Sequence, residues 1–356
     1  MIIMGYVSFE QKRQKAKQVA LWTMCGILFV AAIVLAIVLA IKTGSFDKIG
    51  SGSKNKNDVL KPGATATAAP TAEPTPVPYD WVNEEENTIA TRFNAPEGYT
   101  HIECEEGSFA EYLRNYQLKP YGEKACWWSG GNLIESETTS AEGVFVQQDK
   151  LTKNQQCADT CIMLYAEYLW DNERYDEIIF DFASGFRCDY LTWVSGKRVE
   201  VNGNKVKWVD GGTKDDYSYD NFFTYLKWVY VYASTDSLVT QFKSRDYNDL
   251  QIGDIIVATA RELSAAAQLV SPELADTIKY GHAMIVVDIA VNEAGEKVFM
   301  LAEGNTPATE CAVVENPNPK MSVWFKMGED GKFQKGASGI RWKQEWFYTF
   351  TEMNKP

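Results

Sequence analysis

The chain is predicted to contain an α+β domain in which a helix packs on an antiparallel sheet. Three observations predict this fold class: an apolar helical pattern that begins at Cys157, an aromatic helical pattern over residues 219–233, and several apolar strands between residues 252 and 305. Strands that follow one another, instead of alternating with helices, are typical of an antiparallel sheet.

The helix at Cys157 is the central element of the prediction. Asn154 is a candidate cap, and apolar residues recur three and four positions apart from Ile162 to Leu169. The pattern predicts a helix that runs to about residue 173. In the same way, Ser108 and Glu111 have the spacing of a capping box and predict a short helix over residues 108–116.

The strands are expected in two groups. In the first group, residues 88–93, 143–147 and 178–182 are predicted strands, and residues 189–202 are predicted to form a hairpin region around Ser195-Gly196. In the second group, Gly253-Asp254 leads into a buried strand, and Gly281-His282 starts the next one. A turn at residues 292–295 then leads to a third strand over residues 297–305.

The N-terminal part of the chain has the pattern of a membrane anchor. Residues 19–41 are almost continuously apolar, and their number is close to the roughly 20 residues that a bilayer span requires. The basic residues of the 1–18 tail predict a cytoplasmic N-terminus and an extracellular C-terminal domain, in a single-pass protein of the cell membrane. A cleaved signal peptide is the alternative.

A linker and one globular domain are expected after the span. Residues 42–79 are rich in Pro, Thr and Ala, a composition that cannot bury a core and predicts a disordered linker. Residues 80–351 contain no second linker and no repeat, so we expect one exported domain. Residues 1–42 carry a net charge of +4 and residues 43–356 carry −17, which argues against nucleic acid as a partner.

The candidate catalytic residues are a cysteine and a histidine. A thiol at the start of a helix feels the positive end of the helix dipole, which favours the thiolate nucleophile. His282 begins an apolar strand, where an imidazole has no evident packing role, and can serve as the base. Glu303 or Asn305 would orient its ring from the following strand.

Supporting roles and simpler explanations accompany this assignment. The backbone N–H of Cys157 and the adjacent Gln156 are candidates for an oxyanion site, although Gln156 is equally suited to capping the helix. Asp254, at the entry of the strand before that of His282, is a further candidate for a supporting role. Cys157 alone is compatible with a small buried residue, or with a disulfide among the six cysteines after the span. The cysteine spacing predicts neither a metal site nor a cofactor.

The order of these motifs is similar to that of NlpC-type papain-like cysteine peptidases, which act on the bacterial cell wall. The resemblance implies a nucleophile at Cys157, a strand that starts at Gly253 and Asp254, a base at His282 and an orienting residue at Glu303. It departs from that type at Gln156-Cys157-Ala158, where Asp-Cys-Ser is usual, and in the long separation between Cys157 and Gly253.

The domain more closely resembles a bacterial family known only as domain of unknown function 4846. The resemblance covers nearly all of residues 90–350 and is carried by several stretches: Ser108-Phe-Ala-Glu-Tyr-Leu-Arg, Leu118-Lys-Pro, Gln155-Gln-Cys-Ala-Asp, Tyr225-Leu, Ile252-Gly-Asp, Gly281-His-Ala-Met-Ile-Val-Val-Asp and Leu301-Ala-Glu. The family tends to have Gln where this chain has Glu303.

The leading hypothesis is therefore a membrane-anchored, surface-exposed cysteine hydrolase that acts on amide bonds, with peptidoglycan peptides as the expected substrates. The alternative is a non-catalytic module that binds the cell wall or a protein on the same scaffold. Neither the substrate nor the oligomeric state follows from the sequence.

Overall fold

The main sheet organises the part of the chain that the structure describes. The computed structural model describes residues 80–131, 139–147 and 151–354, which form a mixed α+β fold. Seven strands run in the order β2-β11-β10-β9-β8-β15-β7, and each neighbouring pair is antiparallel. Their bounds are β2 (Thr139–Val144), β7 (Phe242–Ser244), β8 (Ile255–Ala258), β9 (His282–Asn292), β10 (Lys297–Glu303), β11 (Ala312–Val314) and β15 (Phe347–Met353).

Two shorter strands complete this sheet. β1 (Tyr99–His101) pairs with the end of β9, and β12 (Trp324–Phe325) pairs with the start of β10. β9 is buried over most of its length, which explains its nearly unbroken apolar sequence. The β9–β10 hairpin turns at Gly295, whose φ of +78° suits glycine.

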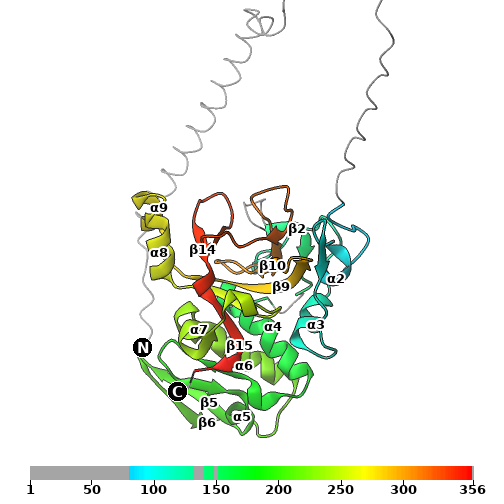
Figure 1. Cartoon of the computed structure of the whole chain (residues 1–356). Helices are drawn as coiled ribbons and strands as arrows, with labels where there is room; N and C mark the ends of the chain where they lie inside the picture. Colours follow the sequence, from blue (N-terminus) through cyan, green and yellow to red (C-terminus); the bar gives the residue numbers. More distant parts are fainter. Residues whose placement is uncertain (1–79, 132–138, 148–150, 355–356) are drawn as a thin grey trace, which may run out of the picture. The chain divides into compact units, whose positions relative to one another are not determined.

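The helix α4 (Cys157–Asp171) lies in the core of the domain. Its residues are buried from Cys157 to Leu169, so it is apolar on nearly every side rather than amphipathic. It contacts β9 and β10 of the sheet as well as α3 (Phe109–Arg114) and α6 (Tyr219–Tyr232), as Figure 1 shows. This packing fixes the position of the first turn of α4, which carries Cys157.

The segment between α4 and β7 accounts for the long separation between Cys157 and Gly253. It holds two small hairpins and several helices: η2 (Tyr175–Glu177), β3 (Ile179–Asp181), β4 (Arg187–Asp189), α5 (Tyr190–Val194), β5 (Lys197–Asn202), β6 (Lys205–Asp210), α6 and α7 (Thr235–Gln241). The aromatic residues of α6 are largely core, as predicted, and Tyr225 packs against Tyr190 and Trp193. In Figure 1 the α5, β5 and β6 elements lie at the end of the domain opposite α8 and α9.

Further helices and one more hairpin lie between strands of the main sheet in the sequence. α8 (Ala260–Gln268) and α9 (Pro272–Thr277) connect β8 to β9, and the hairpin of β13 (Lys332–Gln334) and β14 (Arg341–Lys343) follows β12. The short elements η3 (Tyr247–Asp249) and η4 (Gln344–Trp346) precede β8 and β15, respectively.

The predicted helices at residues 108–116, 157–173 and 219–233 are confirmed as α3, α4 and α6, whereas two predicted strands are wrong. Residues 88–93 form α2 (Ile89–Arg92), and its buried Arg92 donates hydrogen bonds to the carbonyls of Glu86 and Glu142. In the predicted hairpin region, the first expected strand is instead α5 (Tyr190–Val194), because the Asp189 carboxylate accepts a hydrogen bond from the Thr192 N–H at 2.7 Å and caps the helix.

The predicted tail over residues 1–18, the membrane span over 19–41 and the linker over 42–79 lie outside the described residues. Within the described ranges, no helix combines the length and the apolar character that crossing a bilayer requires.

Gly253 lies just before β8, and its substitution tests how tightly the turn into β8 packs against Phe109. Its φ is +96°, and an added Cβ would lie 2.6 Å from the Phe109 ring. Gly295 has a similar φ of +78° but open space around it. We expect Gly253→Ala to lower the free energy of unfolding by about 1–3 kcal/mol more than Gly295→Ala in urea titrations, because only Gly253→Ala adds a steric clash to the backbone strain. Equal losses would show that the Phe109 contact does not restrict this turn.

Candidate active site

Cys157 is the first residue of α4, at the end of the helix that faces the site. The helix starts here because the Gln156 N–H donates to the Asp159 carboxylate at 3.0 Å and the Gln156 carbonyl accepts from the Thr160 N–H at 2.9 Å. The first N–H groups of a helix have no acceptor within the helix, so they leave a partial positive charge beside the Cys157 thiol. Only 4% of Cys157 is exposed.

His282 is the first residue of β9 and pairs with Ala258 at the end of β8. The preceding Gly281 permits a close approach of this strand end to α7, since a Cβ at Gly281 would lie 2.3 Å from the Thr235 hydroxyl and 2.6 Å from the Ala258 carbonyl. The imidazole is largely buried, with 18% of the side chain exposed. A T-shaped contact with the Trp342 ring, with centroids 5.9 Å apart, further restricts its orientation.

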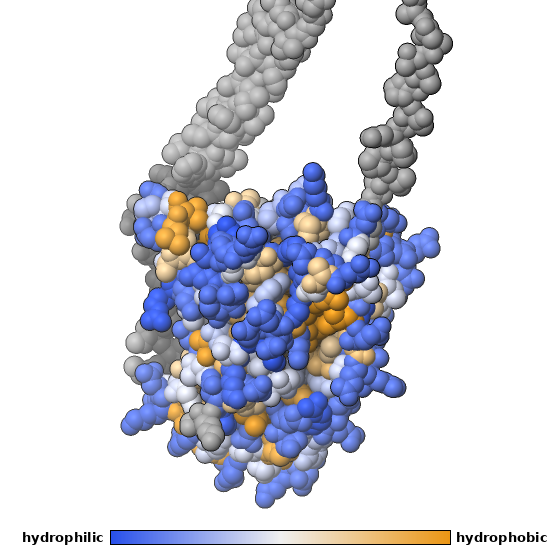
Figure 2. Space-filling view, viewed as in Figure 1, coloured by the Kyte–Doolittle hydropathy of each residue, from blue (hydrophilic) through white to orange (hydrophobic). Residues whose placement is uncertain are grey.

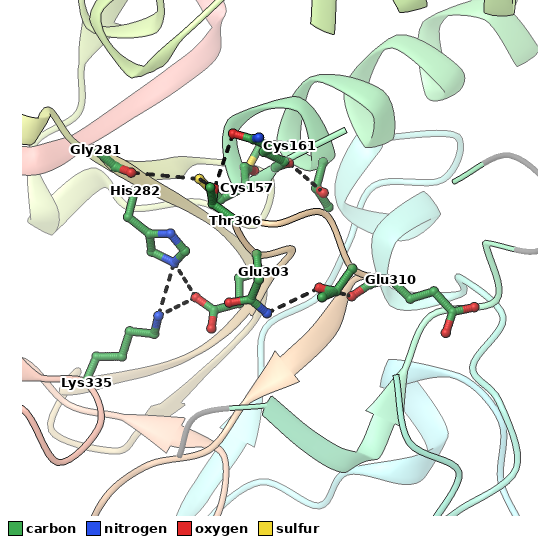
Figure 3. A network of polar contacts seen from close by, with 12 residues as sticks. Cys157, Cys161, Gly281, His282, Glu303, Thr306, Glu310 and Lys335 are labelled. Carbon is green, nitrogen blue, oxygen red and sulfur yellow. Dashed lines mark hydrogen bonds and ion pairs between the residues drawn. The ribbon is translucent and has the colours of Figure 1, made fainter. Parts of the chain in front are cut away.

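Glu303 at the end of β10 holds one side of the imidazole. β10 pairs with β9 as predicted, with Ala302 opposite Ile285, so continuing the register places Glu303 and His282 diagonally on one face. The Glu303 carboxylate is completely buried, and its Oε2 lies 2.5 Å from His282 Nε2. Because Nε2 is occupied by this contact, the other ring nitrogen, Nδ1, is the one that faces Cys157 (Figure 3).

The thiol and the imidazole face each other, and each shifts the pKa of the other. Cys157 Sγ also lies 4.0 Å from the Gly281 carbonyl oxygen and 4.0 Å from the Thr306 hydroxyl. The structure thus brings Cys157, His282 and Glu303 together from α4, β9 and β10, three elements that are far apart in the sequence (Figure 3).

The local charges favour an ion pair of thiolate and imidazolium. Burial raises the pKa of Cys157, but His282, the Ala283 N–H and the Thr306 hydroxyl outweigh it and lower that pKa to about 7. Burial and the Lys335 ammonium lower the pKa of His282, but Glu303 and Cys157 outweigh them and raise it to about 9. Between these values the thiolate and the imidazolium are both favoured.

Lys335 also lies at the site, although no pattern in the sequence predicts it. It follows β13, and its Nζ forms an ion pair with Glu303 Oε2 and lies 3.1 Å from His282 Nε2. Burial raises the pKa of Glu303, but Lys335 and His282 outweigh it and lower that pKa to about 2. No periodic pattern could have identified Lys335, because it lies in a loop whose position depends on the β13–β14 hairpin.

Asn305 does not take the orienting role that was considered for it as an alternative to Glu303. Its side-chain amide donates to the Thr309 hydroxyl at 3.2 Å, because the chain leaves β10 after Glu303 and no longer follows the face of the sheet. The next residue, Thr306, reaches the site instead, and its hydroxyl contacts both Cys157 Sγ and Gln156 Oε1, the latter at 3.3 Å. Gln156 therefore lies beside the thiol, as an oxyanion role requires.

Asp254 does not lie at the site, contrary to the supporting role considered for it. It precedes β8, whereas His282 pairs with Ala258 at the other end of that strand. The buried Asp254 carboxylate accepts the Gln251 N–H at 2.9 Å and forms an ion pair with Arg245 at 3.0 Å. Its role is to hold the turn that leads into β8.

Two pockets adjoin the site, one lined by Gly281 and the other by His282. One, of about 370 Å³, is lined by Gln156, Cys157 and Thr306 together with residues of α6, α7 and the α9–β9 connection. The other, of about 210 Å³, is lined by His282, Lys335 and mainly apolar residues of α8 and the β13–β14 loop. Cys157 thus borders one cavity and His282 borders the other.

The other cysteines in the described part of the chain differ from Cys157. Cys104, Cys126, Cys157, Cys161, Cys188 and Cys311 are all free thiols. Burial raises the pKa of Cys161, one turn along α4, well above its usual value, which disfavours its thiolate. The described residues contain no group of three His, Cys, Asp or Glu side chains that could hold a metal ion.

The reactivity of Cys157 with iodoacetamide should depend on His282. We expect its alkylation rate to rise with pH through a midpoint of about 7, because the thiolate is the reacting form. In His282→Ala the midpoint should move above the ordinary thiol value of about 8.5, since burial then acts without the opposing imidazolium. Mass spectrometry of the peptide that contains Cys157 separates it from the other thiols, and an unchanged midpoint would contradict the contact.

Comparison with known proteins places the chain in a family without an assigned activity. The sequence matches the family described as Domain of unknown function (4846) over residues 89–270 and 274–344, which include Cys157, His282, Glu303 and Lys335. None of the curated proteins and none of the solved structures matches the chain. Since the matched ranges cover well over half of its length, the chain belongs to the family of Domain of unknown function (4846).

Proposed function

We propose that the protein is a membrane-anchored, surface-exposed cysteine hydrolase with a papain-like arrangement, acting on amide bonds of peptidoglycan peptides. The observation that carries the proposal is that the Cys157 thiol faces the His282 imidazole, whose Nε2 is held by the buried Glu303 carboxylate. A nucleophile, a base and an orienting group in this order are the constellation of cysteine hydrolases.

In the first step the Cys157 thiolate attacks the carbonyl carbon, a C–S bond forms, and the carbonyl π electrons move to oxygen. The tetrahedral intermediate collapses, the C–N bond breaks, and the leaving amine takes the proton from His282 Nδ1. In the second step water attacks the thioester and gives a proton to the imidazole, and the thiolate leaves. Glu303 remains ionised and fixes the ring throughout, since its pKa is about 2.

The oxyanion site in this proposal is built at the start of α4. The backbone N–H of Cys157 is free of an intrahelical acceptor, and the carbonyl oxygen of the Gln156 side chain accepts from Thr306, which leaves the amide N–H groups as donors. Donors of this kind stabilise the charge that develops on the carbonyl oxygen. Gln156 and Cys157 line the same pocket.

The papain-like assignment is supported by the order of the elements. The nucleophile starts a buried helix, the base starts a strand of an antiparallel sheet, and the orienting carboxylate ends the next strand. The extracellular location is supported by the apolar run over residues 19–41 and by the basic residues before it. The Pro-, Thr- and Ala-rich residues 42–79 would separate the domain from the membrane.

One observation favours the alternative of a non-catalytic module that binds the wall or a protein. Only 4% of Cys157 is exposed, as for a packing residue. The lowered pKa of the thiol and the pocket that Cys157 lines favour hydrolysis over this alternative. A binding module would retain wall peptides without cleaving them, and Cys157→Ala would not change its affinity.

Hydrolysis of soluble wall peptides by the full-length protein tests the assignment. We expect Cys157→Ala and His282→Ala to lower kcat/KM by at least about 10³-fold, because each removes a group that acts in the transition state. Cys104→Ser is the control, since Cys104 is a half-buried thiol outside the site and should leave the rate unchanged. Binding without release of new amino groups from the substrate would contradict hydrolysis.

The pH dependence of kcat/KM tests the roles of Glu303 and Lys335. We expect a bell-shaped profile, with an acidic limb near the Cys157 pKa of about 7 and a basic limb near the His282 pKa of about 9. Glu303→Gln should shift the basic limb to lower pH, because it removes a charge that stabilises the imidazolium. Lys335→Met should shift it to higher pH, because it removes a charge that destabilises the imidazolium.

Thermal unfolding of both variants separates this effect from loss of the fold. Removing one member of a buried ion pair costs on the order of 3–5 kcal/mol, so the profiles are compared at a temperature where each variant is folded. Shifts of the basic limb in the same direction for both variants would contradict the opposite roles of Glu303 and Lys335.

A further inference from the structure

We propose that the pocket beside His282 binds the side chain of the residue that leaves as the amine, and that this residue is uncharged and apolar. The inference rests on the proposed hydrolase function and adds a substrate class to it. It is carried by the division of the site into two pockets of different chemical character.

The direction of the substrate follows from the two steps of the reaction. The acyl group becomes bonded to Cys157 Sγ and must lie near the start of α4, where the oxyanion donors are. The leaving nitrogen must receive a proton from the imidazole, so the residue that carries it lies on the side of His282. The pocket that contains Cys157 therefore faces the acyl side, and the pocket that contains His282 faces the leaving side.

The leaving-side pocket is small and mainly apolar. Its walls include Leu263 of α8, Ile340 and Trp342, all of which are more than nine-tenths buried, together with Ala337. Its volume of about 210 Å³ is below the range of about 300–1,000 Å³ typical of sites for drug-sized ligands. It suits one aliphatic side chain rather than an extended ligand.

The one cation at this pocket is engaged in another role. Lys335 Nζ contacts both the Glu303 carboxylate and His282 Nε2, and only 10% of the side chain is exposed. An acidic side chain in the pocket would compete with Glu303 for this ammonium, and a basic side chain would be repelled by it. Both kinds of residue are therefore disfavoured relative to an uncharged one.

The surface next to the pocket is also apolar. Leu269 and Val270 in the connection between α8 and α9 are 81% and 48% exposed, and Figure 2 shows an apolar cluster over α8 and α9. A Cβ at Gly339 would lie 3.5 Å from Val270, so the loop that lines the pocket adjoins this surface. An aliphatic residue would thus approach the pocket along apolar surface.

Vinyl sulfones with different substituents on sulfur test the proposal on the full-length protein. The thiolate bonds to the terminal vinyl carbon, the C=C electron pair moves to the carbon next to the sulfone, and that carbon takes the proton from His282. The sulfone substituent then occupies the leaving side. We compare N-acetylglycine-derived probes that carry isobutyl, 2-carboxyethyl or 2-aminoethyl groups, and measure the rate of Cys157 modification by mass spectrometry.

The isobutyl probe should react about tenfold faster than either charged probe, the scale of discrimination that a hydrophobic pocket provides. Ala337→Trp should abolish this preference, because the exposed Ala337 lines the pocket and a larger side chain would fill it. Ala294→Trp in the exposed β9–β10 turn is the matched control and should retain the preference.

The iodoacetamide rate separates failure of this inference from failure of the proposed function. If Cys157 shows its His282-dependent pH midpoint but the three probes react equally, or the carboxylate probe reacts fastest, the apolar leaving-side pocket is disproved. A preference that persists in Ala337→Trp also disproves it. If the iodoacetamide midpoint does not respond to His282→Ala, the hydrolase assignment itself fails.

Discussion

The buried carboxylate of Glu303 is the interaction on which the site depends. A carboxylate without any exposed surface is stable only if opposite charges and hydrogen bonds compensate for lost hydration, and here His282 and Lys335 supply them. The same pairing fixes the imidazole ring and turns its free nitrogen toward Cys157. The same contacts therefore compensate the buried charge and orient the imidazole.

Glu303 carries a negative charge where a neutral amide could also orient the imidazole. An amide can orient an imidazole, but only a carboxylate also stabilises the imidazolium by its charge. The additional negative charge needs a partner within the core, and Lys335 provides one from the β13–β14 loop. Glu303 and Lys335 thus form a pair whose opposite effects on the pKa of His282 partly cancel.

The fold supports this arrangement by burying each element that contributes to it. α4 is enclosed by the sheet and by α3 and α6, so the first turn that carries Cys157 has little freedom to move. His282 and Glu303 lie at the paired ends of β9 and β10, and their separation is set by the ladder of the sheet. Side chains held by rigid elements keep the geometry that the proposed nucleophile and base would require.

The sequence by itself determined the α+β class, the helix that starts at Cys157, and the adjacent strands of His282 and Glu303, because periodicity and caps are local properties of a chain. It predicted strands where α2 and α5 form. In α2 the buried Arg92 overrides the local pattern, and in α5 the Asp189 cap does so. Tertiary structure alone decided that Glu303 rather than Asn305 holds the imidazole, that Thr306 and Lys335 join the site, and that Asp254 lies at the far end of β8. These outcomes depend on where β10 ends and on how separate loops approach each other, and neither leaves a periodic signal in the sequence.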